Sequence, residues 1–393
     1  MNSNNLISIE MIESASQRLK NIVTKTNFEK NIRLSEKYQS NIYFKREDQQ
    51  VVRSYKIRGA YNLISQLTDK QKQNGIITAS AGNHAQGVAY SANELKISAT
   101  IFMPKDTQTQ KINKVKKFGG DYVNIQLVGN NFDESKEAAL LLSEKTNTTF
   151  IPPFDDDLII AGQATVAKEI LDQANFPIDY IIVPIGGGGL IAGVISYIKI
   201  KSPKTKIIGV EPEAAAAMKH SINQDRVTIL NDIDTFVDGA AVKLVGKKTF
   251  DIMKNNIEKI IVVSNGKLSQ EILDLYHEEG IITEPAGALS VACLDLISDQ
   301  IKNKNIVCVI SGGNNDVNRY KEIVEHALIF QDLKKYYTLN TFEDLGKIED
   351  YISDKKIKLN LEKINQKTKT IIISLIFTNK KDIELFEKLF KNK

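Results

Sequence analysis

Short apolar runs rich in β-branched residues alternate with helical patterns along most of the chain. The predicted strands are 41–46, 75–78, 97–103, 121–127, 179–184, 205–210, 258–263 and 305–310. Apolar residues spaced three and four apart predict amphipathic helices at 57–67, 83–94, 108–118, 131–145, 158–173, 190–200, 267–279 and 316–328. Strands that alternate with helices are typical of βαβ units, so we predict an α/β fold with parallel open sheets flanked by helices.

The pattern changes after about residue 330, where glycine nearly vanishes and lysine, asparagine and isoleucine dominate. The elements predicted there are a strand at 334–340, a helix at 342–353, strands at 356–361 and 369–377, and a helix at 381–391. We therefore expect a small appended α+β module at 331–393.

Length and charge narrow the protein class. The chain has 393 residues, enough for two to three domains at roughly 150 residues each. With 42% hydrophobic and 25% charged residues it has the composition of a globular protein, which excludes a disordered or fibrous chain. The formal net charge is only +4, and residues 331–393, with 14 lysines and 10 acids, hold the whole excess. Lys111, Lys114, Lys116 and Lys117 are interspersed with apolar residues on a predicted helix, which favours a solvated face, and we expect no nucleic-acid partner.

The sequence shows no sign of export or of a membrane segment. The N-terminal stretch contains acids and lacks the apolar core of a signal peptide. Residues 180–198 are uncharged, but Pro184 and four consecutive glycines disfavour a membrane helix. Cys293 and Cys308 are too few for a disulfide framework and show no metal-ligand spacing. We expect a cytoplasmic protein without a bound metal.

A run of four glycines, Gly186 to Gly189, follows one predicted strand and opens a predicted helix. Within it, Gly187 and Gly189 with Ala192 match the dinucleotide fingerprint G-x-G-x-x-A, and Glu211 follows about twenty residues on. Alternatively, the backbone N–H groups of the run converge on a single phosphate at the helix N-terminus. A plain packing turn is less favoured, because four glycines lose much backbone entropy on folding.

Two further loops follow predicted strands. The small and polar residues of 78–87, among them Ser80 and Asn83, suit a carboxylate or an oxyanion, although Asn83 could equally be a helix N-cap and His84 a capped surface histidine. Ser311 follows strand 305–310 beside two glycines. No histidine stands in a clear arrangement with it and no G-x-S-x-G motif is present, so a hydrogen-bonding role is favoured over a nucleophilic one.

Lys56 precedes a predicted helix and is followed by Gly59 and Ala60, which permit tight packing. Most lysines in such a chain are surface amines. Burial would lower the pKa of the Lys56 amine, as Schiff-base chemistry requires.

Together and in this order, the loops resemble the fold-type II pyridoxal-phosphate enzymes, most closely the threonine dehydratase (threonine ammonia-lyase) family in its biosynthetic short form. The resemblance covers about residues 5 to 328. Its motifs here are FKREDQQVVRSYKIRGAYN, TASAGNHAQGVA, PFDDDLIIAGQAT, VPIGGGGLIAGV, VEPE, FVDGAAV, EPAGALS and SGGNND. The resemblance implies a two-lobed catalytic region at 1–330, with a large lobe at about 1–40 and 146–330 and a small lobe at about 41–145.

The resemblance also implies pyridoxal 5′-phosphate as cofactor and a role for each matching residue. Lys56 resembles the lysine that holds the cofactor and takes the Cα proton, and Asn83 the residue that hydrogen-bonds the cofactor's 3′ oxygen. The other implied cofactor-binding residues are Gly186, Gly187, Gly188, Gly189, Leu190 and Ser311. The implied substrate-carboxylate loop consists of Ser80, Ala81, Gly82, Asn83 and His84.

The position of Ser311 bears on the reaction. In the family this residue faces the pyridine nitrogen, and a neutral hydroxyl makes the ring a shallower electron sink than an aspartate would, which favours elimination over transamination. The implied reaction converts L-threonine, and L-serine, to 2-oxobutanoate or pyruvate and ammonia, as the first step of isoleucine biosynthesis. A catabolic serine/threonine dehydratase is the related alternative.

Two departures from related serine racemases sharpen this expectation. Ala81 replaces the serine that donates a proton in racemases, so racemisation should be poor. Their divalent-cation site pairs a glutamate with an aspartate six positions later, but here the residue six positions after Glu211 is Ala217. We therefore expect no divalent metal, and the pattern leaves a monovalent ion open.

The tail resembles a single ACT-like regulatory module that lacks its final strand, although 341–346 replaces the usual glycine-rich turn. Such modules sense isoleucine in biosynthetic threonine dehydratases, and the family implies a homotetramer or dimer. The main rival is an NAD-dependent oxidoreductase built on the glycine fingerprint, which leaves Lys56, Asn83 and Ser311 without a role.

Overall fold

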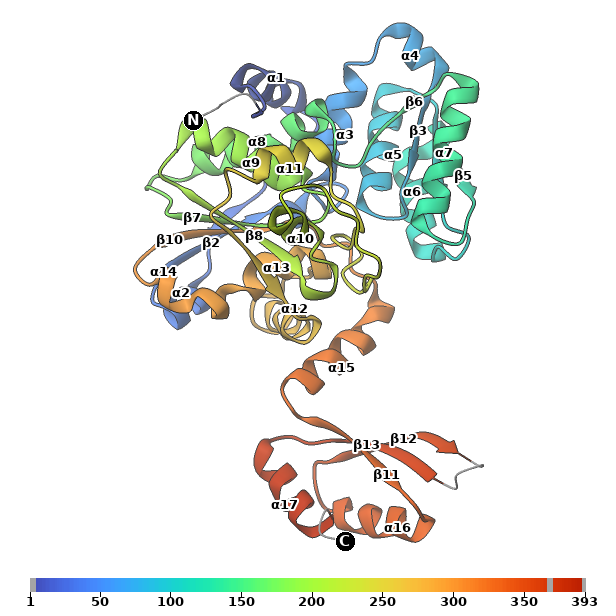
Figure 1. The fold of residues 1–393 in the computed structure, drawn as a ribbon, viewed down its shortest axis with the longest axis vertical. Coiled ribbons are helices and arrows are strands. Elements are labelled where there is room, and N and C mark those ends of the chain that lie inside the picture. The colour runs from blue at the N-terminus through green and yellow to red at the C-terminus, as the bar shows by residue number, and fades with distance from the viewer. Residues whose placement is uncertain (1–4, 366–369, 391–393) are drawn as a thin grey trace. The chain divides into compact units, whose positions relative to one another are not determined.

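The computed structural model describes residues 5–365 and 370–390 (Figure 1). The chain divides into two compact units, which are described separately. The first contains the residues up to Ser264 together with Ile281–Asn315, and the second contains Asn265–Gly280 and the residues from Asp316 onward.

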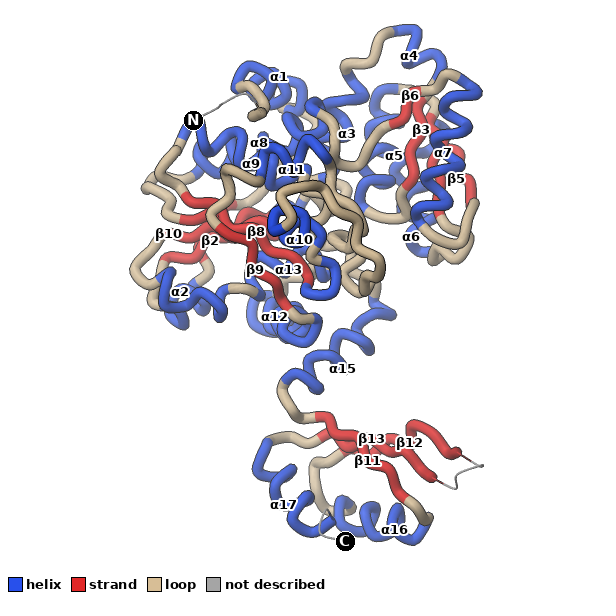
Figure 2. Tube along the Cα trace, in the orientation of Figure 1, coloured by secondary structure: helices blue, strands red, loops and turns tan. Residues whose placement is uncertain are grey.

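A six-stranded sheet forms the centre of the first unit (Figure 2). Its strands, in spatial order, are β1 (Phe28–Lys30), β2 (Asn41–Arg46), β10 (Asn305–Ile310), β7 (Tyr180–Pro184), β8 (Lys206–Pro212) and β9 (Lys259–Val263). All neighbours run parallel except β1, which is antiparallel to β2. Every residue of β7 is buried, as expected for a central parallel strand covered on both faces.

Helices cover both faces of this sheet. On one face lie α1 (Ile9–Leu19), α8 (Asp157–Gln173), α9 (Gly189–Lys201) and α11 (Lys247–Met253), and on the other lie α2 (Ile32–Tyr38), α13 (Pro285–Ala292) and α14 (Ser298–Ile301) (Figure 1). The core between sheet and helices is built from isoleucine, valine and alanine of α8, α9, β7 and β8. This core holds the carboxyl ends of the strands, where the loops emerge, in fixed positions.

A smaller parallel sheet lies in the same unit. Its order is β5 (Val123–Leu127), β4 (Ala99–Met103), β3 (Ile76–Ala79) and β6 (Thr149–Phe150). The associated helices are α3 (Lys56–Ser65), α4 (Asp69–Asn74), α5 (Asn83–Leu95), α6 (Thr109–Gly119) and α7 (Phe132–Thr146). The first unit therefore contains two sheets, as expected for two lobes.

The lobe boundaries differ from those expected. Strand 41–46 was expected in the small lobe, but it is β2 and pairs along its whole length with β10 in the large sheet. Residues 149–150, expected in the large lobe, pair with β3 in the small sheet. The local pattern predicts that a strand forms, but the choice of sheet depends on strands hundreds of residues away.

The second unit contains the predicted tail module. Its sheet has the order β11 (Lys334–Leu339), β13 (Thr370–Ile376) and β12 (Lys358–Asn365), all antiparallel, with helices α16 (Phe342–Ile352) and α17 (Lys380–Phe390). The predicted order of strand, helix, two strands and helix is confirmed, and the predicted ends at 369 and 391 lie outside the described residues. The core of the module includes Ile373, Leu375, Phe377 and Phe386.

The unit that holds the tail is larger than 331–393, because it also includes α12 (Asn265–Glu279) and α15 (Tyr320–Phe330). These two helices pack closely: a Cβ on Gly266 would come within 2.6 Å of Phe330 Cβ. The break therefore falls at Asn315 and Asp316 rather than at 330. No helix in the described ranges is long and apolar enough to cross a membrane, and residues 180–198 form β7, the glycine loop and most of α9.

Candidate active site

Lys56 is the first residue of α3, where the chain leaves the loop after β2. Its side chain is only partly exposed, and Nζ donates a hydrogen bond to the carbonyl oxygen of Pro153 at 2.7 Å. Burial lowers the pKa of the amine to about 8, against the opposing effect of the Glu284 carboxylate. A substantial fraction of such an amine is neutral near physiological pH, as a nucleophile or base requires.

The N-termini of α3 and α5 meet at this lysine. A Cβ on Gly87 would come within 3.2 Å of the backbone of Lys56 and Ile57, so a glycine permits the approach. Burial and the Lys56 charge lower the pKa of His84 to about 3, and the His84 ring donates from Nε2 to the Ile151 carbonyl oxygen at 3.0 Å. His84 is therefore a buried, neutral histidine rather than a surface residue.

Asn83 is the first residue of α5 and does not cap it, because the N-cap position is Gly82. The Asn83 side chain instead donates from Nδ2 to Glu284 Oε1 at 2.6 Å. In the preceding loop, Gly82 donates to the Ser80 hydroxyl at 3.2 Å, and a Cβ added at Gly82 would meet nothing within 4 Å. The loop that also contains Ala81 thus opens onto free space beside Asn83.

Ser311 also comes next to the lysine, because the Tyr55 N–H donates to the Ser311 carbonyl oxygen at 3.2 Å. Its buried hydroxyl contacts the Ala286 carbonyl oxygen at 3.4 Å. Ser54, two residues before Lys56, is fully buried, and its hydroxyl has no hydrogen-bond partner among the described residues. A buried hydroxyl of this kind is costly unless a ligand or water satisfies it.

The glycine run and Lys56 both contact one segment, Pro153–Phe154. Phe154 follows Pro153, the acceptor of Lys56, and a Cβ on Gly187 would overlap the Phe154 ring. Gly188 has φ +94°, and a Cβ there would come within 2.8 Å of Thr249. Glycine is therefore required at both positions, by packing at Gly187 and by backbone conformation at Gly188.

The N–H groups of residues 186 to 191 have no hydrogen-bond acceptor anywhere in the described part of the chain. Gly187, Gly188, Gly189 and Leu190 are buried, and α9 starts at Gly189. Buried donors at a helix N-terminus form an anion site, since the helix dipole adds to the free N–H groups. A phosphate group fits this cradle.

The oxidoreductase alternative requires Glu211 to bind a ribose hydroxyl, and the structure does not support this role. Glu211 is 1% exposed, and its two carboxylate oxygens accept from the N–H groups of Met218 and Lys219, both at 2.8 Å. It caps α10 (Ala217–Asn223) and is not free to bind a ribose hydroxyl. The fingerprint assignment to Gly187, Gly189 and Ala192 is wrong for this reason.

The basic stretch on α6 is not a uniform solvated face. Lys111 pairs with Asp238 at 2.8 Å, and Lys114 donates to Asn314 at 3.3 Å. Lys116 and Lys117 are exposed. Two of the four lysines thus join the small lobe to loops of the large lobe.

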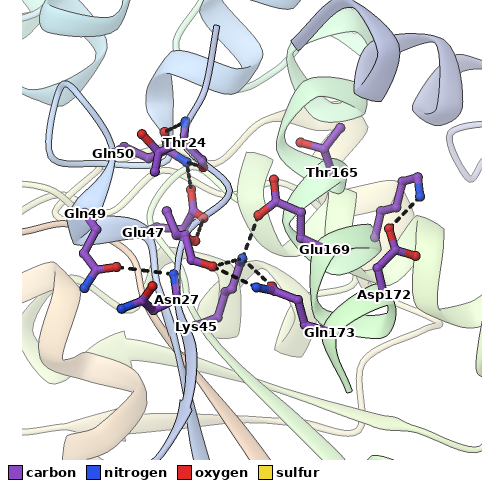
Figure 3. Close-up of polar contacts among 12 residues, drawn as sticks. Thr24, Asn27, Lys45, Glu47, Gln49, Gln50, Thr165, Glu169, Asp172 and Gln173 are labelled. Carbon is purple, nitrogen blue, oxygen red and sulfur yellow. Dashed lines mark hydrogen bonds and ion pairs between the residues drawn. The ribbon is translucent and has the colours of Figure 1, made fainter. Parts of the chain in front are cut away.

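A buried charge cluster supports α3 behind the lysine. Arg58 is fully buried and pairs with Glu47 at 2.8 Å and with Glu169 of α8 at 2.7 Å. Figure 3 shows Lys45 pointing at Glu169 and Gln173, to which its Nζ donates at 2.6 and 2.8 Å. These ion pairs fix the first turn of α3 against the large lobe.

Comparison with known proteins agrees with this geometry. Residues 19–312 match the family described as pyridoxal-phosphate dependent enzyme. The chain belongs to the pyridoxal-phosphate dependent enzyme family. Members that resemble it include the biosynthetic L-threonine dehydratase IlvA of Lactococcus lactis, 51% identical over 89% of this chain and 85% of that protein. The protein of the same name from Bacillus subtilis is 46% identical over 90% of this chain and 84% of that protein.

Solved structures of the family have the same fold. The processed form of threonine deaminase isoform 2 from Solanum lycopersicum matches with a TM-score of 0.77 and 40% identity, over 82% of this chain and 95% of that chain. The serine racemase of maize matches with a TM-score of 0.75 and 30% identity, over 81% of this chain and 97% of that chain.

The residues of this site fit the family's cofactor. The unsatisfied N–H groups of 186–191 suit its phosphate, the low pKa of Lys56 suits its aldehyde, and the orphaned Ser54 hydroxyl marks polar space beside that lysine. The sequence motifs contained two further site residues to which no role was given, Glu284 and Asn314. Their only signal was an acid directly before Pro285 and an asparagine after a glycine pair.

Proposed function

We propose that this protein is a pyridoxal-phosphate-dependent threonine dehydratase. It converts L-threonine to 2-oxobutanoate and ammonia, as the first step of isoleucine biosynthesis, and accepts L-serine to give pyruvate. The observation that carries this proposal is the convergence of Lys56, Asn83 and Ser311 with a glycine loop full of free N–H groups. Relatives named biosynthetic threonine dehydratase, about half identical over most of the chain, support the substrate.

The cofactor is held by three groups of residues in this proposal. Lys56 binds its aldehyde carbon, the N–H groups of Gly186 to Leu190 bind its phosphate, and Asn83 and Ser311 hydrogen-bond the ring. When bound, pyridoxal phosphate supplies an electron sink for the charge that develops at the substrate Cα.

The chain's own residues do the rest. The Lys56 amine, whose pKa is about 8, takes the proton from Cα and holds it. The N–H groups at the start of α5, with the Ser80 hydroxyl, bind the substrate carboxylate above the free space at Gly82. Ala81 carries no hydroxyl to return a proton to the opposite face of Cα, which disfavours racemisation. The β-hydroxyl needs a proton to leave as water, and Lys56, which holds the Cα proton, is the donor that this chain supplies.

The test is a steady-state assay of oxoacid release from threonine and from serine by the purified protein. We expect a yellow protein whose visible band bleaches with borohydride, and faster release from threonine than from serine. A colourless protein that binds NAD and releases no oxoacid contradicts the proposal.

We propose further that the tail module binds isoleucine and that the enzyme is a cytoplasmic homo-oligomer, a tetramer or dimer. The strand and helix order of β11 to α17 supports the ACT-like assignment, and two buried cysteine thiols suit a reducing compartment. Saturating isoleucine should inhibit the enzyme and alter its substrate cooperativity. Activity indifferent to isoleucine favours the catabolic alternative, and light scattering gives the number of subunits.

A further inference from the structure

Glu284 is a buried acid of the site that the reaction above does not use. It stands directly before α13 and is 5% exposed. Its Oε1 accepts from Asn83 Nδ2 at 2.6 Å, and its own N–H donates to the Gly312 carbonyl oxygen at 3.2 Å. One residue thus joins the first turn of α5 to the loop after β10.

The glycines of two motifs make room for this carboxyl group. A Cβ on Gly312 would overlap Glu284 Oε1, and a Cβ on Gly239 would come within 3.4 Å of the same atom. A Cβ on Gly287 would overlap the Gly312 carbonyl oxygen. The carboxylate can occupy this position only because Gly312 has no side chain, and Gly287 in turn lets the Gly312 backbone come close.

Glu284 and Asn314 hold the two ends of the Asn83 amide. Asn314 Nδ2 donates to Asn83 Oδ1 at 2.8 Å and to the Val52 carbonyl oxygen at 2.8 Å. A carboxylate only accepts hydrogen bonds, so it selects the NH₂ end of Asn83, while the Asn314 donor selects the oxygen end. The second N–H of Asn83 has no acceptor within the described residues and is free for a ligand.

Burial and the neighbouring charges place the pKa of Glu284 in the neutral range, so its protonation changes near neutral pH. Burial raises its pKa to about 7, the Asp238 carboxylate acts in the same direction, and the Asn83 and Asn314 hydrogen bonds and Lys111 oppose this. The Glu284 charge in turn raises the pKa of Lys56 against the effect of burial.

Two more titratable groups belong to this environment. Burial and the Glu284 charge raise the pKa of Tyr55, so this phenol stays neutral. His84 is held neutral by burial and by Lys56. The backbone places Glu284 beside Lys56: the Tyr55 N–H donates to the Ser311 carbonyl oxygen, and the Glu284 N–H donates to that of the next residue, Gly312. Glu284 is therefore the carboxylate that raises the pKa of the Lys56 amine.

We propose that Glu284 is a positioning residue: it presents the Asn83 amide as a hydrogen-bond donor to the cofactor and supplies a negative charge beside the segment that carries Lys56. The first part rests on the proposed function, because it takes pyridoxal phosphate as the ligand. The second part is a property of the chain alone and can be measured without cofactor or substrate.

The test compares E284Q, E284D and the wild type with E211Q, which removes an equally buried carboxylate outside the site. The first readout is the pH midpoint at which Lys56 in the full-length, cofactor-free protein reacts with an amine reagent, followed by peptide mass spectrometry. The second is the dissociation constant for pyridoxal phosphate. Thermal unfolding confirms that each variant is folded.

E284Q should lower the Lys56 midpoint by about one pH unit and weaken cofactor binding roughly five- to tenfold. E284D keeps the charge and should leave the midpoint near that of the wild type while binding weakens. An unchanged midpoint in E284Q, or an equal shift in E211Q, overturns the proposal. If E284Q does not fold, E284D provides the test: a Lys56 midpoint lower than that of the wild type, although the negative charge is kept, overturns the proposal. A wild type that binds no pyridoxal phosphate refutes the proposed function instead, and leaves the midpoint comparison intact.

Discussion

Two buried carboxyl groups of the first unit have the same raised pKa but different surroundings. Burial raises the pKa of both Glu211 and Glu284 to about 7. Glu211 gives both oxygens to the first N–H groups of α10. Glu284 instead contacts the side chain of Asn83 and acts on the amine of Lys56.

The raised pKa of each carboxyl group reports its burial, whereas its hydrogen-bond partners decide whether the group is structural or functional. A carboxylate satisfied by backbone N–H groups stabilises a helix end. A carboxylate that contacts side chains which bind a ligand or change protonation can influence the chemistry of the site. The surroundings of Glu211 and of Glu284 can therefore be changed separately by mutation.

Replacing Lys56 tests the functional region most strongly. K56A removes the only site amine that we propose as base, so the rate of threonine dehydration should fall by roughly 10³-fold or more, within the range for removal of a general base. Steady-state oxoacid release measures the loss. K56R serves as a control that keeps the positive charge, and should be equally inactive because a guanidinium does not give up its proton. A K56A protein that dehydrates threonine at the normal rate refutes the account.

Moving the Glu284 carboxyl group without removing it should have the next largest effect. In G312A the new Cβ would overlap Glu284 Oε1, so the acid must leave Asn83, and cofactor binding should weaken about tenfold. Titration with pyridoxal phosphate gives the constant. The matched control is G346A, where a Cβ meets nothing within 4 Å and the site is unaffected. Equal affinities for the two variants would show that the Glu284 position does not matter.

Glu211 should affect stability rather than activity. Because its folded-state pKa is raised above the usual 4.5, its contribution to stability is full below pH 4.5 and is lost as the pH rises through 7. E211Q abolishes this loss, so the stability of the wild type relative to E211Q should fall between pH 4.5 and 7 by on the order of 3 kcal/mol. Urea unfolding at several pH values measures it. A pH-independent difference would place the Glu211 pKa near 4.5.

The smallest effect concerns the ion pair beside Glu284. Because the carboxylate form of Glu284 presents the Asn83 donor, protonation of Glu284 should produce the acid limb of kcat/KM. K111M removes a positive charge that lowers the pKa of Glu284, so this limb should move to higher pH by a few tenths of a unit, as expected for a part-exposed pair. D238N removes a charge that raises this pKa and should move the limb to lower pH. Shifts of the same sign in both variants would contradict the assignment of the limb to Glu284.

The sequence predicts the elements of this fold well where the signal is local. Strands 41–46 and 305–310 have the predicted bounds, because each is a short run that a parallel sheet buries. The pairing of these two strands with each other is not a local property, and β2 was assigned to the wrong lobe. Short elements such as β1 and β6 carry too few residues to show a period.

In the site, too, the sequence predicts local motifs but not the contacts between distant segments. The glycine run and the lysine lie in recognisable motifs, and the structure brings them together through Pro153 and Phe154. Spacing favoured Glu211 as a ligand-binding acid, whereas its geometry is that of a helix cap. Glu284 went unassigned because its partner Asn83 is 201 positions away in the chain.

The most direct test of the central claim is to reduce the purified full-length protein with borohydride and map the modified peptide by mass spectrometry. The account predicts a single site of pyridoxal-phosphate attachment, at Lys56, in a protein that releases 2-oxobutanoate from threonine before reduction and loses this activity after it. Attachment at another lysine, or activity that survives reduction, would contradict it.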